Sequence, residues 1–316
     1  MKTVGLIGAR GHTGRELIAL LGRRSDMQLA YASSRAMAGE PVANMAEGAP
    51  VGLKFEALAP DSAAARGADA IILAMPNGEA RAWADTIHAV RPDTVLVDLS
   101  ADFRFDADWL YGLPELYGRD RHAGAMRISN PGCYATAGQL AVAPARAWLS
   151  GPAHLFGVSG YSGAGTTPSR KNDTAALADN LMPYKLADHI HEHEMSRHLG
   201  ADVRFSPHVA EFFRGIVLTA QLEFNSVMTA DRLRAIYAEA YDGEALIEVR
   251  ETMPEARDGS FNPGAVVGGF TVAEDGRRGV VVCTLDNLLK GAAVQAVQNL
   301  ALALELPEMD GLLTQA

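Results

Sequence analysis

The first third of the chain alternates short apolar runs with segments of helical composition. The apolar runs lie at residues 3–8, 28–32, 69–74 and 94–99. They are apolar at nearly every position, which is typical of strands buried on both faces of a parallel sheet. Helical composition fills residues 15–24 and 80–90 between them. This alternation predicts an α/β fold with a doubly wound parallel sheet.

The pattern changes in the second half of the chain. Residues 216–224 alternate between apolar and polar positions, and further strand patterns lie near 245–250, 265–273 and 279–285. These runs predict a largely antiparallel sheet of mixed pattern. Ala- and Leu-rich stretches at 135–149 and 288–306 predict one helix each.

Composition narrows the class of protein. Hydrophobic residues make up 48% of the 316 residues, which suffices for the cores of the two ordinary domains that this length suggests. The formal net charge of −10 argues against nucleic acid or an anionic membrane as a partner. A small anionic substrate is compatible with this charge if local Arg or Lys side chains bind it.

The two cysteines and the N-terminal sequence bear on location. Two cysteines, Cys133 and Cys283, cannot form a disulfide framework and are expected as reduced thiols. No apolar run approaches the roughly 20 residues of a membrane span, and residues 1–7 lead into a strand pattern without the layout of a signal peptide. We therefore expect a cytoplasmic protein.

A glycine-rich turn follows the first predicted strand. Its spacing is GxxGxxG, and a predicted helix follows at once, which is the context of a dinucleotide-binding turn. Glycines let the backbone approach a pyrophosphate, which then lies at the N-terminus of the helix. A glycine turn without a ligand is the alternative. The cofactor-binding residues predicted here are Gly8, Arg10, Gly11, His12, Thr13 and Gly14.

The end of the second strand indicates which dinucleotide binds. Ser33, Ser34 and Arg35 stand where an NAD site usually has Asp or Glu for the ribose 2′-hydroxyl. Small hydroxyl residues followed by a guanidinium suit a 2′-phosphate. The sequence thus favours NADP, with an ordinary surface loop as the alternative.

Other loops should reach ligands because ligands bind at the carboxyl ends of parallel strands. Pro76 and residues 100–104 follow two such strands and should line the cofactor crevice. A Gly-, Ser- and Thr-rich loop at 156–169 offers N–H groups and hydroxyls to an anion, with an empty flexible crossover as the alternative. We place Ser159 at the substrate in this loop, and Ser162, Gly163 and the turn residue Asn287 at the cofactor.

Cys133 is the candidate nucleophile. Pro131 and Gly132 break regular structure just before it, and the predicted helix 135–149 follows, which places Cys133 in the first turn of a helix. The first turn of a helix carries unpaired N–H groups and the positive end of the dipole, which favour a thiolate. A thiolate attacks carbonyl carbon. A buried structural cysteine is the alternative, and packing is the role expected of Cys283 in its apolar run.

Three of the nine histidines gather in residues 189–193, with His198 close behind. His193, Glu194 and His198 do not form an HExxH motif, because the second histidine falls at i+5 and lies about 140° round a helix from the first. A general acid/base for the cysteine and a solvated polar helix start are both open, with a metal site less favoured. Arg214, before the strand at 216–224, is either an anion clamp or a surface charge.

These motifs together resemble one family, the N-acetyl-γ-glutamyl-phosphate reductases of the aspartate-semialdehyde dehydrogenase type. The resemblance runs nearly end to end. The octapeptide 129–136 and the closing block 285–299 are its specific parts, and the glycine turn is not specific. In the same order lie the segments 100–104, 111–115 and 160–169.

The resemblance implies a fold, a reaction and roles. The fold would be a Rossmann-type NADP-binding domain, residues 1–132 with 288–316, and an α+β catalytic and oligomerisation domain, residues 133–287. NADPH would reduce an acyl phosphate to an aldehyde in arginine biosynthesis, through a thioester on Cys133. His191 would be the general acid/base in a His-x-His-x-x-Glu segment that includes Glu194, with His189 in reserve. Where many members have Arg and Thr, this chain has Ile190 and Glu192.

Substrate-binding roles follow from the same resemblance. Arg104 would bind phosphate and Arg214 a substrate carboxylate, with Asn130 beside the nucleophile. We expect a homo-oligomer, a dimer or tetramer, joined through an apolar sheet face of the second domain, and no metal. The rivals are a reductase of aspartyl phosphate or carrier-linked aminoadipyl phosphate, a non-catalytic NADP-binding sensor, and a zinc hydrolase built on the histidines.

Overall fold

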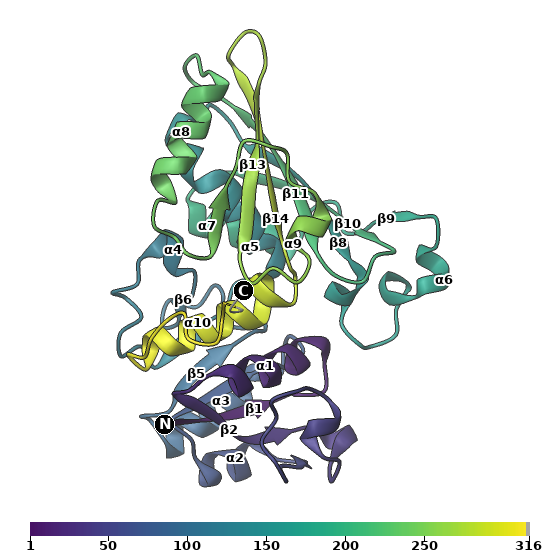
Figure 1. Cartoon of the computed structure of the whole chain (residues 1–316), viewed down its shortest axis with the longest axis vertical. Coiled ribbons are helices and arrows are strands. Elements are labelled where there is room, and N and C mark those ends of the chain that lie inside the picture. Colours follow the sequence, from purple (N-terminus) through teal and green to yellow (C-terminus); the bar gives the residue numbers. More distant parts are fainter. Residues whose placement is uncertain (314–316) are drawn as a thin grey trace. The chain divides into compact units, whose positions relative to one another are not determined.

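The computed structural model describes residues 1–313 (Figure 1). The chain forms two compact units. Unit 1 contains Met1–Gly132 and the described residues from Ala292 onwards, and unit 2 contains Cys133–Gly291. The chain thus passes between the units at Gly132/Cys133 and again at Gly291/Ala292, whereas the sequence places the second crossing at 287/288.

Unit 1 is built on a parallel sheet of seven strands in the order β3-β2-β1-β4-β5-β7-β6. The chain leaves β1 for β2 and β3 on one side and returns to β4 on the other, so the β1/β4 pair is the point where the strand order reverses. The strands are β1 Lys2–Ile7, β2 Met27–Ser33, β3 Phe55–Glu56, β4 Ala70–Leu73, β5 Val95–Asp98, β6 Leu110–Tyr111 and β7 Arg127–Ser129.

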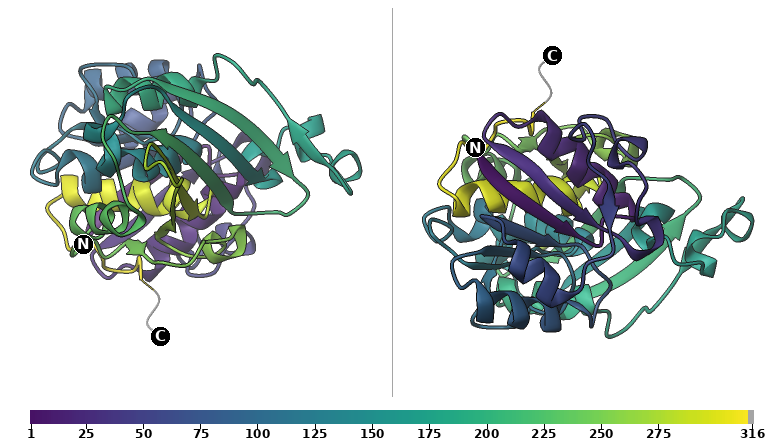
Figure 2. Two further views of the ribbon diagram at one scale, coloured as in Figure 1. Left: turned by 90° about the horizontal axis from the view of Figure 1, so that it is seen from above. Right: turned by 90° about the horizontal axis from the view of Figure 1, so that it is seen from below.

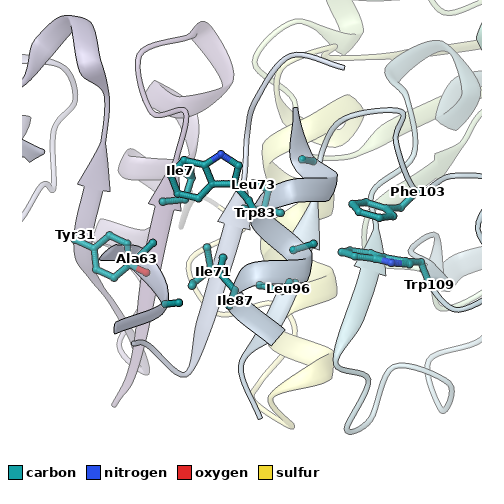
Figure 3. Packing of buried hydrophobic residues seen from close by; sticks show 13 residues of the cluster. Ile7, Tyr31, Ala63, Ile71, Leu73, Trp83, Ile87, Leu96, Phe103 and Trp109 are labelled. Atoms are coloured by element: carbon teal, nitrogen blue, oxygen red, sulfur yellow. The ribbon is translucent and has the colours of Figure 1, made fainter. Parts of the chain in front are cut away.

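Helices lie on both faces of this sheet, as the alternating sequence pattern predicts. The α-helices of unit 1 are α1 His12–Arg23, α2 Pro60–Arg66, α3 Ala80–Val90, α4 Pro114–Tyr117 and α10 Val294–Ala303, with short 3-10 turns at Arg35–Met37 and Val42–Asn44. Trp83 and Ile87 of α3 pack on Ile71, Leu73 and Leu96 of the sheet (Figure 3). Side chains alternate along strands, so Leu6, Ile72 and Val97 face the other side, where α1 and α10 pack together (Figure 2).

Unit 2 has a mixed sheet of seven strands in the order β12-β13-β14-β11-β8-β10-β9. Most neighbours are antiparallel, as predicted, but β8 pairs with β10 and β12 pairs with β13 in parallel. The strands are β8 Ala153–Gly160, β9 Leu181–Pro183, β10 Val203–Ala210, β11 Ile216–Glu223, β12 Ile247–Val249, β13 Ala265–Val272 and β14 Arg278–Leu285.

Three helices of unit 2 pack on its sheet: α5 contacts β11 and β14, α7 contacts β10, and α8 contacts β13 (Figure 1). The α-helices are α5 Cys133–Val142, α6 Thr174–Leu177, α7 Ile190–Leu199, α8 Ala230–Ala240 and α9 Ala256–Gly259. Turns of 3-10 geometry lie at Ala143–Trp148, Tyr161–Ala164 and Arg170–Asn172, and a π-turn at Leu289–Ala293 precedes α10.

Two predicted helices have different bounds. The helix predicted at 135–149 starts at Cys133 and ends at Val142, where a 3-10 turn begins. Pro144 lacks an N–H and its ring would clash with the carbonyl of Leu140, so the α-helix stops. The uninterrupted helix predicted over 288–306 is also wrong: it starts as a π-turn, and the α-helix ends at Ala303 before Glu305, whose φ is 55°.

No helix in residues 1–313 is both long and apolar enough to cross a membrane.

Candidate active site

Cys133 is the first residue of α5, which confirms the prediction that it lies in the first turn of a helix. Its side chain is half-buried, whereas the nine residues that complete α5 are buried. The thiol therefore lies at the positive end of the helix dipole, which favours the thiolate over the thiol. Cys283, in β14, is fully buried, and burial raises the pKa of its thiol far above the usual value.

The π-turn packs directly on the nucleophile. A Cβ atom built on Gly291 would lie 2.7 Å from Cys133 Cβ and 3.2 Å from Cys133 Cα. Gly291 N–H donates to the carbonyl oxygen of Asp286, which closes the wider turn. Only glycine fits this close approach of backbone to side chain. Glycine at position 291 therefore allows the backbone of the π-turn to pack directly against Cys133.

Two tyrosines adjoin Cys133. The Tyr134 hydroxyl donates to His208 O at 2.6 Å, and a hydrogen bond joins it to Tyr184. Burial raises the pKa of both phenols well above the usual value, and the nearby negative charge of Cys133 adds to this rise. Both tyrosines therefore stay neutral at physiological pH and act as hydrogen-bonding groups. Tyr184 follows the short edge strand β9 and belongs to none of the motifs that the sequence shows.

The histidine segment forms the start of α7, which packs against α5. His189 is the N-cap, and its Nδ1 accepts a hydrogen bond from His191 N at 3.2 Å. Burial, followed by the charges of Lys185, Lys171 and His193, lowers the pKa of His189 to about 4. His189 is therefore neutral near pH 7.

His191 and Glu194 lie one turn apart on α7. The His191 ring is 6.0 Å from the ring of Tyr134, and Glu194 is fully buried. Glu192 has a structural contact instead, since its Oε2 accepts from Phe205 N at 2.8 Å. His193 is largely exposed, which leaves His191 as the half-buried histidine on the α5 side of the segment.

The predicted ligand loops of unit 2 meet at one place. Asn287 Nδ2 donates to Ser162 Oγ at 2.8 Å, and Asn287 Oδ1 accepts from Gly215 N at 2.8 Å. Ser159 Oγ donates to Gly160 O, and a Cβ on Gly163 would come within 3.0 Å of that hydroxyl oxygen. The four predicted residues Ser159, Ser162, Gly163 and Asn287 therefore form one polar cluster at the end of β8.

Arg214 is not a surface charge. Its side chain is buried, and its Nε and Nη2 donate to the Asp286 carboxylate at 2.5 and 3.2 Å. The guanidinium also lies over the Phe261 ring, 4.3 Å from the centroid. Asp286, which the sequence analysis did not single out, already neutralises this arginine. The assignment of Arg214 to a substrate carboxylate stays a prediction.

In unit 1, the glycine turn has the features that a pyrophosphate needs. Gly8 has φ +81°, and a Cβ there would lie 2.3 Å from Ala74 O, while a Cβ on Gly14 would lie 2.1 Å from Ala9 O. Gly11, the N-cap of α1, has open space around its Cα and no side chain capping the helix. The first turn of α1 carries no acidic residue. An anion can therefore approach the N-terminus of α1 through this turn.

Four predicted cofactor residues lie at the carboxyl edge of the same sheet. Ser33 ends β2 and Ser34 follows it, both buried, whereas Arg35 is exposed. Exposed Pro76 follows β4, whose end adjoins the glycine turn through a hydrogen bond from Ala74 N to Ile7 O. These positions surround the point where the strand order reverses, and the residues fit a dinucleotide there.

Arg104 and Asn130 meet at the ends of β5 and β7. Arg104 Nε donates to Asn130 O at 3.1 Å and its Nη2 donates to Leu99 O at 2.9 Å. Asn130 Nδ2 donates to Ala292 O, and Asn130 Oδ1 accepts from Asn299 Nδ2 at 3.0 Å. Buried Asn299 of α10, also missed by the sequence analysis, therefore orients the amide of Asn130.

Within residues 1–313, no three His, Cys, Asp or Glu side chains are grouped so that they could hold a metal ion.

The chain matches two domain families. Residues 3–125 match the family described as "Semialdehyde dehydrogenase, NAD binding domain", and residues 133–287 match "Semialdehyde dehydrogenase, dimerisation domain". Solved structures agree in fold. Aspartate semialdehyde dehydrogenase II of Vibrio cholerae in complex with ASA has a TM-score of 0.78 at 16% identity, over 96% of this chain and 98% of its own. The Candida albicans enzyme with NADP has a TM-score of 0.75 at 14% identity, over the same shares. Fold and sequence therefore define a dehydrogenase of the semialdehyde type.

Curated relatives narrow the class. A protein of Xanthomonas campestris pv. campestris (strain B100) is 54% identical over 97% of both chains. One of Stenotrophomonas maltophilia (strain R551-3) is 55% identical over 97% of this chain and 96% of its own. Both are named N-acetyl-gamma-glutamyl-phosphate reductase. The chain belongs to the N-acetyl-gamma-glutamyl-phosphate reductase family.

Proposed function

We propose that the protein reduces N-acetyl-L-glutamyl 5-phosphate to N-acetyl-L-glutamate 5-semialdehyde and phosphate, using NADPH, in arginine biosynthesis. The observation that carries this proposal is Cys133 at the first position of α5, in a chain 54% identical to reductases of this name. The substrate is an acyl phosphate, and a thiolate is the nucleophile suited to its carbonyl carbon.

The reaction starts with attack on the acyl phosphate. The Cys133 thiolate forms a bond to the carbonyl carbon, and the carbon–oxygen bond to phosphate breaks, which leaves a thioester and free phosphate. When bound, NADPH supplies the hydride that reduces this carbonyl. The carbon–sulfur bond then breaks, the aldehyde leaves, and the Cys133 thiolate is restored.

His191 is the proposed acid/base. It protonates the oxygen during hydride addition and takes the proton back as the aldehyde forms, a role that histidine side chains commonly fill as general acids and bases. His189 suits this role less, because its pKa of about 4 keeps it neutral and its Nδ1 caps α7. Glu194 lies one turn from His191 on α7, and its proposed role is to hold the His191 side chain in position.

The test runs the reaction backwards, because the acyl phosphate is unstable. Purified protein is given N-acetylglutamate semialdehyde, phosphate and NADP, and NADPH formation is followed by absorbance. We expect phosphate-dependent turnover. Aspartate semialdehyde is run in parallel: turnover with it alone would move the enzyme to another acyl phosphate, and no turnover with either would favour a non-catalytic NADP-binding protein.

The cofactor preference is proposed from the end of β2. No carboxylate follows that strand, and exposed Arg35 is free to meet a 2′-phosphate. Arg35→Asp should raise the KM for NADPH by roughly 10- to 100-fold, the range expected for a lost charge-assisted hydrogen bond, and leave the KM for NADH nearly unchanged. Arg121→Asp, at another exposed arginine of unit 1, is the control. Equal effects of Arg35→Asp on both nucleotides would refute the assignment.

The oligomer is proposed to form through the sheet face of unit 2 that faces away from α5 and α7. Register pairing places Phe156, Val158, Val217 and Val280 on this face, and Phe156 is 43% exposed. Residues 133–287 match a dimerisation domain, and an apolar strand face is a typical contact between subunits.

Phe156→Glu should weaken self-association by roughly 100-fold or more, because a buried unpaired carboxylate is costly. Sedimentation velocity measures the shift to monomer. Val227→Glu, at an exposed valine outside the sheet, should leave the oligomer intact. A wild-type monomer, or an unchanged oligomer in Phe156→Glu, would exclude this face.

A further inference from the structure

The substrate of the proposed function carries a carboxylate and a phosphate, whereas the chain has a formal net charge of −10. Anion binding therefore needs cations placed locally. Arg214 does not offer an unbalanced positive charge to the substrate, because the Asp286 carboxylate already pairs with it. A different cation lies in the cluster around Cys133.

Lys171 is that cation. Its Nζ lies 4.8 Å from the centroid of the Tyr184 ring, a cation–π contact. Tyr184 is hydrogen-bonded to Tyr134, lies in the field of Cys133, and meets the His189 ring edge-to-face at 5.7 Å. The ammonium group is thus stacked on a ring that belongs to the cluster around the nucleophile.

The backbone that carries Lys171 is fixed. Next to it, Asn172 Nδ2 donates to Gly165 O and Thr167 O at 2.9 and 2.8 Å, and Asn172 Oδ1 accepts from Ser169 N at 2.8 Å. Asp173 caps α6 by accepting from Ala175 N and Ala176 N. Ordering this loop in advance lowers the entropy cost of holding an anion.

Within the described residues, the charge of Lys171 has no carboxylate counter-ion. The neighbouring Asp173 carboxylate is used in the α6 cap. The side chain is nevertheless half-buried. A half-buried cation without a counter-ion is suited to an anionic ligand. Its field also reaches His189, whose pKa it helps to lower.

We propose that Lys171 is a substrate-binding residue, whose ammonium group, held over Tyr184, pairs with an anionic group of the substrate. This proposal rests on the proposed function. The anion is either the carboxylate of the acetylglutamyl moiety or the phosphate. Reverse-direction kinetics separate the two, because semialdehyde and phosphate are then different substrates with their own KM values.

The experiment compares Lys171→Met, Lys171→Arg and Lys54→Met, the last at an exposed lysine of unit 1. Lys171→Met should raise one KM at least tenfold: that of phosphate if Lys171 binds the phosphoryl group, or that of semialdehyde if it binds the carboxylate. The kcat and the KM for NADP should change less than threefold. Lys171→Arg should restore most of the affinity, and Lys54→Met should match wild type. Unchanged KM values for both substrates, or a fall in kcat alone, would overturn the proposal.

A second readout does not depend on turnover. Alkylation of Cys133 by iodoacetamide is timed with and without phosphate or N-acetylglutamate. One of these anions should slow alkylation in wild type and Lys171→Arg, and this protection should be lost in Lys171→Met. If the wild type does not turn over the semialdehyde but the protection pattern holds, the proposed function fails and the anion site stands. Equal protection in all variants would refute the role of Lys171.

Discussion

Cys133→Ser is expected to lower phosphate-dependent turnover of N-acetylglutamate semialdehyde by at least about 10³-fold, since a serine hydroxyl remains protonated where a thiol ionises. The helix dipole at the start of α5 acts on the thiol but cannot bring an alcohol into its ionised range. Steady-state NADPH formation measures the loss.

The matched control is the other thiol. Cys283→Ala should keep at least about a third of wild-type activity, because Cys283 is fully buried in β14 and its pKa is raised by burial. Mass spectrometry after brief alkylation should find the label on Cys133 alone. Activity that survives in Cys133→Ser would exclude the thioester route.

Asp286→Asn is expected to lower the free energy of unfolding by about 3–5 kcal/mol, the cost of leaving a buried charge without its partner. The Asp286 carboxylate is fully buried and accepts hydrogen bonds from Arg214, from Phe261 N at 2.7 Å and from Leu288 N at 2.8 Å. It thereby ties the ends of three loops to the end of β14. Urea unfolding followed by circular dichroism measures the change.

Two further variants test whether the loss of stability in Asp286→Asn comes from the broken ion pair with Arg214 or from the loss of a carboxylate as such. Asp275→Asn, at an exposed carboxylate of the same unit, should change stability by less than about 0.5 kcal/mol. The double variant Arg214→Met with Asp286→Leu should lose less than the sum of the two single changes, because no charge is then stranded. Additive losses would mean that the two side chains act independently.

Local chemistry made much of this fold predictable. Helix α3 runs from Ala80 to Val90 as the composition indicates, and Cys133 starts α5 because Pro131 and Gly132 exclude a helix before it. The strand β10 escaped notice because Pro207 interrupts its pattern. Helix α8 has a local signal in the sequence: the cap Thr229 precedes Leu233 and Tyr237, which are spaced for one buried face.

Contacts between residues far apart in the sequence limited how much of the candidate site could be predicted. The sequence marks Arg214 as a cation but cannot reveal that Asp286, 72 residues later, neutralises it. Lys171 likewise becomes a candidate binding residue only in the folded chain, where η5, the 3-10 turn Arg170–Asn172, places its ammonium group over the Tyr184 ring. Motifs identify residue types at local spacing, whereas these contacts depend on how β8, β9 and the following loops fold together.

The two crossings of the chain between units have a consequence for biosynthesis. Unit 2 is one uninterrupted stretch, Cys133–Gly291, so all of its strands leave the ribosome before α10 does. Unit 1 must wait, because α10 supplies Leu300 and Val297 to its core and Asn299 to Asn130. Until then the sheet face that α10 covers stays open to solvent. The inserted unit can therefore fold first, and the half-made nucleotide unit is the stage at which a nascent chain is most exposed to chaperones and to aggregation.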